Sequence, residues 1–253
     1  MFFAVDLDNT LIFSYKHYAQ GICVETKEGK ALSYMTPSAY EHLQQLKERL
    51  TIVPLTTRSL EQYQRIQLWS SGPAPYALTS NGAVLLASGV PDAAWAAQTA
   101  RLIADSLPEL KRALALLQQD EAVTLAPRLV DEAFVYTKSQ QAANSLDALS
   151  RILDLDKVYL DHNGEKLYVL PKALSKGAAL KRLSARLGCR CAAAAGDSFF
   201  DLSMLEAADA AIIPQDSPLA EYLSNHKQVL ASDRPGERFS EFVLETIERL
   251  SLS

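Results

Sequence analysis

The stretch Phe2-Phe3-Ala4-Val5-Asp6-Leu7-Asp8-Asn9-Thr10-Leu11 places two carboxylates directly after a short apolar run. An apolar run of this length is typical of a strand buried on both faces of a parallel sheet. Residues two apart share a face of an extended chain, so we expect Asp6 and Asp8 to point into one crevice. Two neighbouring carboxylates repel each other without a cation, which favours a hard divalent ion such as Mg²⁺. The alternative is that Asp8-Asn9 only begins a turn, and the local sequence leaves the two interpretations comparable.

Alternating apolar and helical segments on both sides of the chain indicate an open parallel α/β sheet. In the N-terminal part, the predicted elements after the first strand are a helix over 37–49, a strand over 50–55, a helix to about 68 and a strand over 76–78. In the C-terminal part they are a helix over 175–187, a strand over 191–195, a helix over 200–207, a strand over 210–214 and a helix over 237–250.

The middle of the chain has a different pattern. Its predicted elements are a helical stretch over 95–119 broken near Pro108, alternating segments over 122–126 and 132–138, a helix over 140–153 and strands over 157–161 and 166–170. Asn163-Gly164 between the last two strands is a hairpin signal, which implies antiparallel pairing. We therefore expect a Rossmann-like, mostly parallel α/β core made by residues 1–83 and 172–253. An α+β cap domain, 84–171, is expected to be inserted into it as a lid.

Three further polar clusters follow predicted strands or begin predicted helices. Thr56-Thr57-Arg58 offers a hydroxyl and free N–H groups that suit a phosphate oxygen, although threonine as an ordinary N-cap explains it equally well. Lys176 lies near the start of a helix, where a cation opposes the helix dipole, and this favours a functional role over a solvated surface lysine. Gly196-Asp197-Ser198-Phe199-Phe200-Asp201 adds two acids after a buried strand. Ligands bind at the carboxyl ends of strands in such sheets, so the four clusters predict one site.

The four clusters, in this order, resemble the motifs of the haloacid dehalogenase-like superfamily of phosphatases. The resemblance spans the whole chain and is nearest to the Cof-type and sucrose-phosphatase-like group, which carries a large cap between the second and third motifs. Ser80-Asn81-Gly82-Ala83 and the segment from Leu170 to Gly177 resemble that group's signatures on either side of the cap. One departure is Phe200, where many relatives carry asparagine before the last acid, which weakens the assignment of Asp201.

The resemblance implies a mechanism in which Asp6 attacks phosphorus and forms an aspartyl-phosphate. Asp8 would protonate the leaving oxygen and then deprotonate the hydrolytic water. Thr56 would hold a phosphoryl oxygen, and Lys176 would offset charge between Asp6 and the phosphate.

The resemblance also implies the ligands of the metal and of the substrate. Mg²⁺ would lie among Asp6, the backbone carbonyl of Asp8 and Asp197, while Asp201 would steady the metal site. The residues expected to contact the substrate are Thr10, Thr57, Arg58 and Asn81. Among polar residues of the cap, Arg128, Lys138 and His162 are candidates, and each one taken singly is more simply explained as a solvated side chain.

The implied activity is a Mg²⁺-dependent phosphomonoesterase acting on a small phosphorylated metabolite such as a sugar phosphate. A phosphomutase on the same scaffold begins with the same intermediate, but its helical cap would follow the first motif, and the segment 13–35 is too short for one. A non-catalytic regulator that binds a phosphorylated metabolite would be expected to have lost Asp6, Asp8 or Lys176, and all three are present.

Composition restricts the partners. The 253 residues carry 25 basic and 30 acidic side chains, and no segment concentrates the basic ones, so nucleic acid and anionic membranes are not expected as partners. No apolar run is long enough to span a bilayer, and the N-terminus lacks the features of a signal peptide, which predicts a cytoplasmic protein. The Cys189-x-Cys191 pair lacks further ligands nearby and is interpreted as part of a buried strand.

Overall fold

The computed structural model describes residues 1–225 and 228–252. The chain divides into two compact units, one formed by Met1–Asp92 with Ser175–Ser253 and the other by Ala93–Leu174. Each helix among the described residues is too short or too polar to cross a bilayer.

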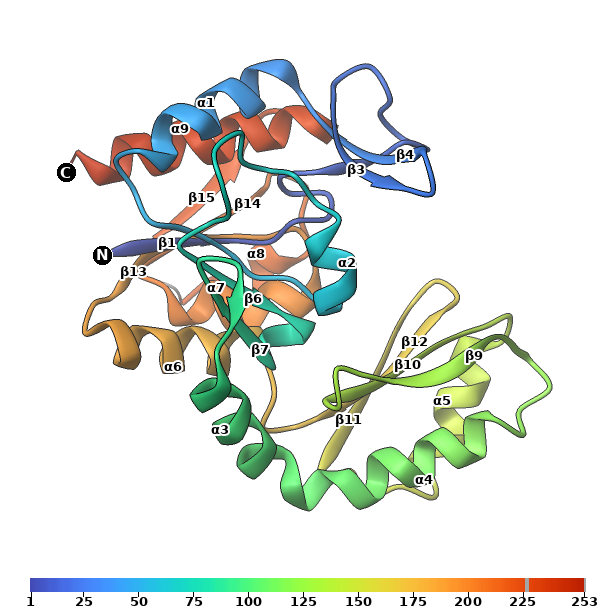
Figure 1. The fold of residues 1–253 in the computed structure, drawn as a ribbon. Coiled ribbons are helices and arrows are strands. Elements are labelled where there is room, and N and C mark those ends of the chain that lie inside the picture. The colour runs from blue at the N-terminus through green and yellow to red at the C-terminus, as the bar shows by residue number, and fades with distance from the viewer. Residues whose placement is uncertain (226–227, 253) are drawn as a thin grey trace. The chain divides into compact units, whose positions relative to one another are not determined.

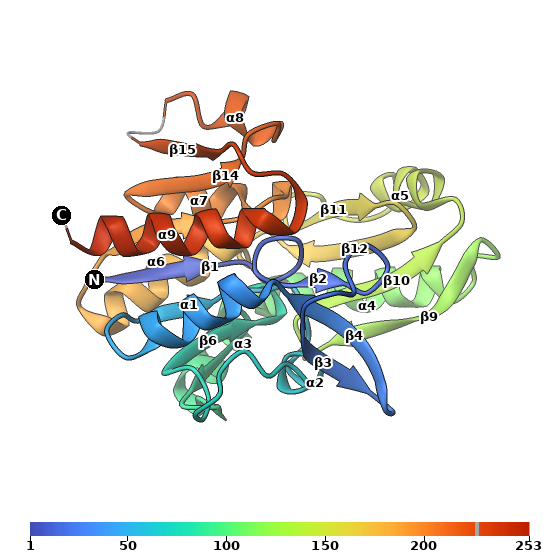
Figure 2. The same cartoon turned by 90° about the horizontal axis from the view of Figure 1, so that it is seen from above.

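The first unit is built on a five-stranded parallel sheet with the order β15-β14-β13-β1-β5 (Figures 1 and 2). Its strands are β1 (Phe2–Val5), β5 (Ile52–Pro54), β13 (Cys191–Ala195), β14 (Ala210–Pro214) and β15 (Val229–Ser232). The three neighbouring strands β13, β1 and β5 end together, because Val5 is in register with both Ala195 and Pro54. The segments that follow them, which begin at Asp6, Gly196 and Leu55, therefore start at one edge of the sheet.

Helices cover both faces of this sheet (Figure 1). The helices on one face are α1 (Pro37–Lys47) and α9 (Phe239–Ser251), which contact each other, and those on the other are α6 (Lys176–Leu187) and α7 (Leu202–Ala207). The core between the first pair and the sheet includes Val5, Leu43, Ala195 and Ile247. The expected Rossmann-like α/β fold is confirmed, and β15 is a strand that the sequence pattern did not predict.

Two small antiparallel sheets extend the first unit. One has the order β2-β4-β3, with β2 (Phe13–Ser14), β3 (Ile22–Lys27) and β4 (Lys30–Met35), and the other has the order β6-β7-β8, with β6 (Tyr76–Thr79), β7 (Val84–Ala87) and β8 (Val90–Pro91). The remaining elements of the unit are α2 (Leu60–Gln64), α8 (Leu219–Tyr222) and the 3₁₀ helices η1 (Ser80–Gly82), η3 (Phe199–Asp201) and η4 (Gly236–Arg238).

Two sequence-based expectations differ from these elements. The helix expected to reach about residue 68 ends at Gln64, because the chain then pairs with β3, where the N–H of Gln67 donates to the carbonyl of Val24 at 2.7 Å. The segment 84–91 was assigned to the inserted domain but pairs with β6. The boundaries between the units accordingly lie at Asp92/Ala93 and Leu174/Ser175 instead of 83/84 and 171/172.

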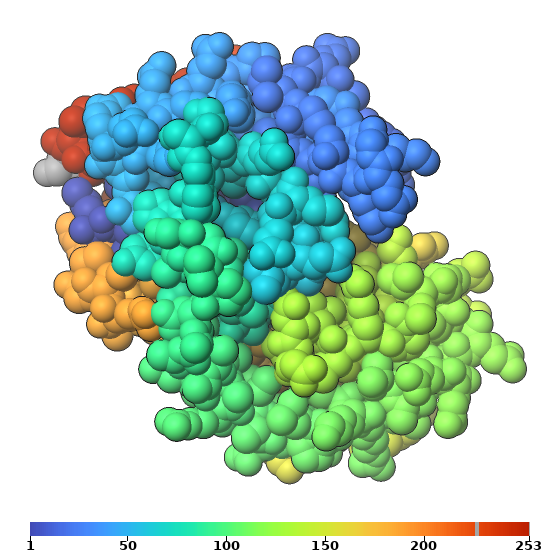
Figure 3. Space-filling model, in the orientation of Figure 1, coloured from blue at the N-terminus to red at the C-terminus, as the bar shows by residue number. Residues whose placement is uncertain are grey.

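The second unit is an α+β sandwich of one antiparallel sheet and its helices. Its sheet has the order β11-β12-β10-β9, with β9 (Val123–Val130), β10 (Phe134–Ser139), β11 (Val158–Asn163) and β12 (Lys166–Pro171). Its helical elements are α3 (Ala93–Ile103), η2 (Ala104–Ser106), α4 (Leu107–Leu117) and α5 (Ala142–Ser150), and the break expected near Pro108 falls at η2. Leu110 and Leu117 of α4 pack against Val135 and Val169 of the sheet, while the outer sides of α3 and α4 form the surface drawn in green in Figure 3.

Candidate active site

Asp6 and Asp8 lie in a tight turn at the end of β1. The N–H of Asp6 donates to the carbonyl of Ala195 at 2.9 Å, which ties the first motif to the adjacent strand. The carbonyl of Leu7 accepts the N–H groups of Thr10, Leu11 and Ile12, and Asn9 adopts a φ of 60°. Asparagine tolerates this left-handed conformation better than most residues. The turn buries Asp6 and leaves the side chain of Asp8 half exposed.

Lys176 is a buried cation held between two carboxylates. Its ammonium lies 2.5 Å from Asp6 Oδ1 and 2.5 Å from Asp201 Oδ1, and the residue is only 1% exposed. Ser175 caps the helix by accepting the N–H of Ala178, so Lys176 begins α6 and its side chain reaches the end of β1. Burial lowers the pKa of Lys176, but the charges of Asp201 and Asp6 outweigh it and raise the pKa above the ordinary value. Lys176 is therefore a permanent positive charge beside Asp6.

Asp201 organises the loop after β13. Its Oδ2 accepts the N–H groups of Asp197 (3.1 Å) and Ser198 (3.0 Å) and the hydroxyl of Ser198 (2.9 Å). Gly196 leaves room for it, because a Cβ at that position would lie 2.4 Å from the Cβ of Asp201. With Lys176 on its other oxygen, Asp201 is saturated by protein donors, which suits an orienting role.

Asp6, Asp197 and Asp201 each place a carboxylate oxygen within 4.8 Å of the others. Burial, followed by the charge of Asp201, raises the pKa of Asp197 to about 6. Burial also raises the pKa of Asp6, and Asp201 and Asp197 add to this while Lys176 opposes it. Three carboxylates that share one ammonium leave an excess of negative charge, and their ligand atoms are all oxygens. This donor set fits a hard divalent cation.

The carboxylate of Asp8 does not belong to this group of acids, because Arg58 holds it. Arg58 Nε donates to Asp8 Oδ2 and Nη2 donates to Asp8 Oδ1, both at 2.8 Å. Arg58 also donates through Nη1 to Glu25 Oε2 at 2.7 Å. Asp6 and Asp8 therefore have different partners, Lys176 for Asp6 and Arg58 for Asp8.

Thr56 and the η1 turn are linked to each other beside this ion pair. The hydroxyl of Thr56 is buried and accepts the N–H of Arg58 at 3.1 Å, and its carbonyl accepts the N–H of Asn81 at 2.9 Å. Ser80 and Asn81 adopt φ values of 53° and 59°, and Gly82 adopts 87°. Ser80 and Asn81 store strain in this left-handed backbone, whereas Gly82 adopts it freely, and such strain is common at functional sites.

The other predicted contacts differ in their burial. Thr10 is fully buried, and its hydroxyl has no hydrogen-bond partner among the described residues, while Thr57 is half-buried. Glu25 and Ser33, which contact Arg58, were missed by sequence reasoning because no local pattern connects them to it. Ser198 was also missed, although the Ser198-x-x-Asp201 spacing is a readable capping box.

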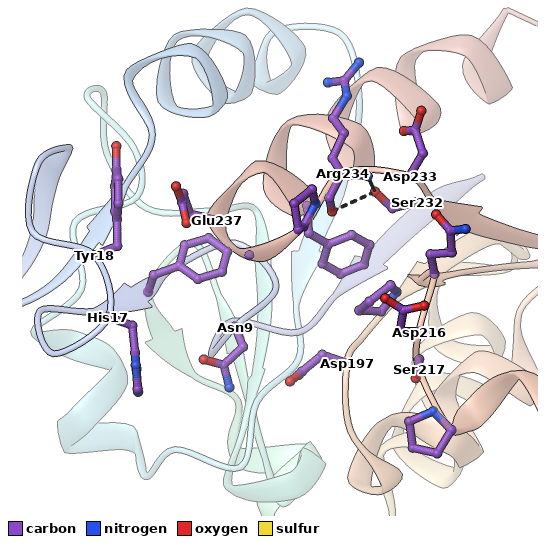
Figure 4. A pocket seen from close by; sticks show the side chains of 17 residues that line it. Asn9, His17, Tyr18, Asp197, Asp216, Ser217, Ser232, Asp233, Arg234 and Glu237 are labelled. Carbon is purple, nitrogen blue, oxygen red and sulfur yellow. Dashed lines mark hydrogen bonds between the residues drawn. The ribbon is translucent and has the colours of Figure 1, made fainter.

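A cavity of about 680 Å³ in the first unit opens beside the acids (Figure 4). Asn9 and Asp197 line it, together with the loops that follow β14 and β15 and with His17 and Tyr18. Figure 4 shows Asn9 and Asp197 close together. The hydrogen bond between their side chains offsets part of the rise that burial causes in the pKa of Asp197. The acid group therefore borders an open space of the core itself.

Acids, a buried lysine and a threonine at the ends of parallel strands accord with a phosphatase of the haloacid dehalogenase-like superfamily, and the match to a phosphatase family profile shows that the chain is of this class. The chain belongs to the sucrose-6F-phosphate phosphohydrolase family, whose sequence profile matches residues 1–249. The resemblance inferred from the motifs is thereby confirmed. No curated protein sequence matches the chain.

Solved structures share the fold at low sequence identity. The sucrose-phosphatase of Synechocystis sp. PCC6803, solved with sucrose and phosphate, is 18% identical, with a TM-score of 0.64 over 99% of this chain and 98% of that one. The protein 0175 of Thermoplasma acidophilum is 13% identical, with a TM-score of 0.62 over 100% of both chains. A phosphatase of the same superfamily from Bacteroides thetaiotaomicron is 13% identical, with a TM-score of 0.57 over 100% of this chain and 96% of that one.

Proposed function

We propose that this protein hydrolyses the phosphomonoester of a small phosphorylated sugar with the help of Mg²⁺, through an aspartyl-phosphate on Asp6. The observation that carries the proposal is the buried contact of Asp6 with Lys176 beside Asp197 and Asp201. The phosphoryl group that Asp6 must accept is negatively charged and is repelled by the acids around it. The ammonium of Lys176 and a metal ion held by the neighbouring acids would offset this repulsion.

In the first step a carboxylate oxygen of Asp6 forms a bond to phosphorus as the bond to the sugar oxygen breaks. Asp8 gives its proton to that departing oxygen, and in the second step it takes a proton from the water that attacks the phosphorus of the aspartyl-phosphate. Lys176 offsets negative charge next to Asp6. Mg²⁺ held by Asp6, Asp197 and the Asp8 carbonyl would neutralise charge on the phosphoryl oxygens.

The residues around the turn are proposed to bind the phosphoryl group. Thr56 presents a buried hydroxyl at the end of β5, and Thr10 has a buried hydroxyl without a protein partner. Thr57 follows Thr56 in the loop after β5, and Asn81 lies in the η1 turn, whose N–H at Asn81 donates to the carbonyl of Thr56. In this proposal Arg58 both holds Asp8 and contributes positive charge to the substrate side of the site.

One face of the sheet in the second unit carries side chains that suit a sugar. Strand pairing puts Asp161, Tyr168, Tyr136 and Arg128 in one row across all four strands. The row lies on the sheet face opposite the helices, because Val135, Leu167 and Val169, their neighbours of opposite parity, pack in the helix-side core. The rings of Tyr136 and Tyr168 are 5.2 Å apart, and Arg128 lies 5.6 Å from the ring of Tyr136.

Aromatic rings with a carboxylate at one end and a guanidinium at the other suit a polyhydroxylated ring. Lys138 lies on the same sheet face as Tyr136, because the two are two residues apart on β10. His162 is next to Asp161 on β11 and therefore lies on the other face. We therefore keep Arg128 and Lys138 as candidates for sugar contacts and drop His162. The family and the Synechocystis structure with sucrose and phosphate point to the same substrate class.

The test is a screen of sugar phosphates against the purified chain with Mg²⁺ and with EDTA. Wild type should release phosphate only with Mg²⁺, and Asp6→Asn should be inactive at the same folded concentration. Arg128→Ala should raise KM for the preferred sugar phosphate and leave hydrolysis of p-nitrophenyl phosphate unchanged. Turnover by Asp6→Asn equal to that of wild type would contradict the proposed nucleophile.

A further inference from the structure

Glu25 is a buried carboxylate that belongs to none of the motifs of the site. It lies on β3, is 3% exposed, and receives hydrogen bonds from three side chains. Arg58 Nη1 donates at 2.7 Å and the Ser33 hydroxyl at 2.6 Å to its Oε2, and Arg65 Nη2 donates at 3.3 Å to its Oε1. A carboxylate buried this deeply among fixed donors has little freedom to move.

Arg58 connects Glu25 to Asp8. One edge of its guanidinium, Nε with Nη2, binds both oxygens of Asp8, and its remaining nitrogen Nη1 binds Glu25. The two acids differ in exposure, since the side chain of Asp8 is 49% exposed and that of Glu25 only 2%. Glu25 is therefore the fixed acid of the two, and its hydrogen bond with Nη1 sets the orientation of the Arg58 guanidinium.

We propose that Glu25 is a positioning residue, which orients Arg58 so that Arg58 keeps one oxygen of the Asp8 carboxyl group in place while the other oxygen, released from Arg58, passes a proton to the leaving oxygen. The inference rests on the proposed function, because it assigns Asp8 the transfer of that proton. It adds that the β3–β4 hairpin, through Glu25 and Ser33, is part of the catalytic apparatus without touching the substrate.

Proton donation matters only when the leaving group needs it, and this gives a test. An alkyl phosphate such as glucose 6-phosphate loses a strongly basic alkoxide, whereas p-nitrophenyl phosphate loses a stable phenolate. Glu25→Gln should lower kcat/KM for the alkyl ester by at least about 10-fold and for the aryl ester by less than about 3-fold, the effect expected of a displaced catalytic group. The control is Glu61→Gln, which removes the other acid on Arg65 (3.2 Å) from an exposed position and leaves Arg58 untouched.

A double-mutant cycle separates positioning from general damage to the fold. In an Asp8→Asn background, Glu25→Gln should cause little further loss on the alkyl ester, because the group that it positions is already gone. Equal losses on both esters, or an undiminished effect in the Asp8→Asn background, would overturn the proposal. If Glu25→Gln does not fold, Ser33→Ala decides by the same comparison, because it removes the hydroxyl that donates to Glu25 and accepts from Arg58 Nη2 at 3.3 Å.

A measurement on the resting protein keeps this inference separate from the activity. In ¹⁵N spectra of arginine side chains, the Arg58 signal, assigned by its loss in Arg58→Lys, should show hindered rotation of the guanidinium in wild type and in Glu61→Gln. That hindrance should disappear in Glu25→Gln, and its persistence would refute the anchoring role. Lack of Mg²⁺-dependent hydrolysis by wild type would instead refute the proposed function and leave this result standing.

Discussion

Lys176 is the residue on which the charge balance of the site depends. It is the cation that the described structure places directly on both Asp6 and Asp201, and removing one member of a buried ion group leaves the others without compensation. We expect Lys176→Met to lower the free energy of unfolding in EDTA by about 3–5 kcal/mol and kcat/KM by about 10²–10³. Urea unfolding and steady-state kinetics measure both effects. Lys181→Met, at an exposed position of the same helix, should change neither, and equal effects of the two substitutions would contradict this role.

Asp197 makes the stability of the metal-free protein depend on pH. Its folded pKa of about 6 lies above the ordinary 3.8, so the folded state binds this proton more tightly than the unfolded state. The stabilisation from the protonated form is complete below about pH 4 and is lost as the pH rises through the folded pKa of about 6. Asp197→Asn should therefore melt several degrees higher than wild type at pH 8 in EDTA, with the difference vanishing near pH 4. Asp216→Asn, an exposed acid of the same cavity, should show no such trend, and a pH-independent difference for Asp197→Asn would refute the assignment.

At the scale of elements, the η1 turn depends on the contact of Gly82 with α6. Gly82 has a φ of 87°, and a Cβ there would lie 2.1 Å from the Cβ of Ala179. Gly82→Ala should lower the free energy of unfolding by more than about 2 kcal/mol, because overpacking adds to the backbone strain. Gly72→Ala is the matched control, with a φ of 70° and no atom within 4 Å of the added carbon, so it measures the strain alone. Chemical unfolding of the two variants should separate them, and equal losses would mean that the α6 contact is unimportant.

Elements whose side chains follow a simple period were readable from the sequence. The apolar run of β1 and the capped helix α6 indicated where Asp6 and Lys176 would lie, because strand ends and helix starts fix the position of a residue in an α/β sheet. The β2–β4 sheet gave no such signal. Its role depends on Glu25, which meets Arg58 33 residues further along the chain. An ion pair at that separation follows from tertiary packing and cannot be inferred from spacing, and for the same reason the pairing of Asp8 with Arg58 was not predicted.

At the scale of the whole molecule, each unit has a core of its own, whereas all three clustered acids belong to the first unit. Mg²⁺ that binds the folded acids stabilises the protein by about 2.7 kcal/mol at 100 times its dissociation constant. The gain should appear where the acids are anchored, because a ligand protects the segments that must stay folded to bind it. We therefore expect Mg²⁺ to slow amide exchange in residues 2–8 and 191–201 but not in the Val135 and Val169 strands of the second unit. Hydrogen exchange with and without Mg²⁺ measures this, Asp197→Asn should abolish the protection, and uniform protection of both units would show that the cation acts outside the acid group.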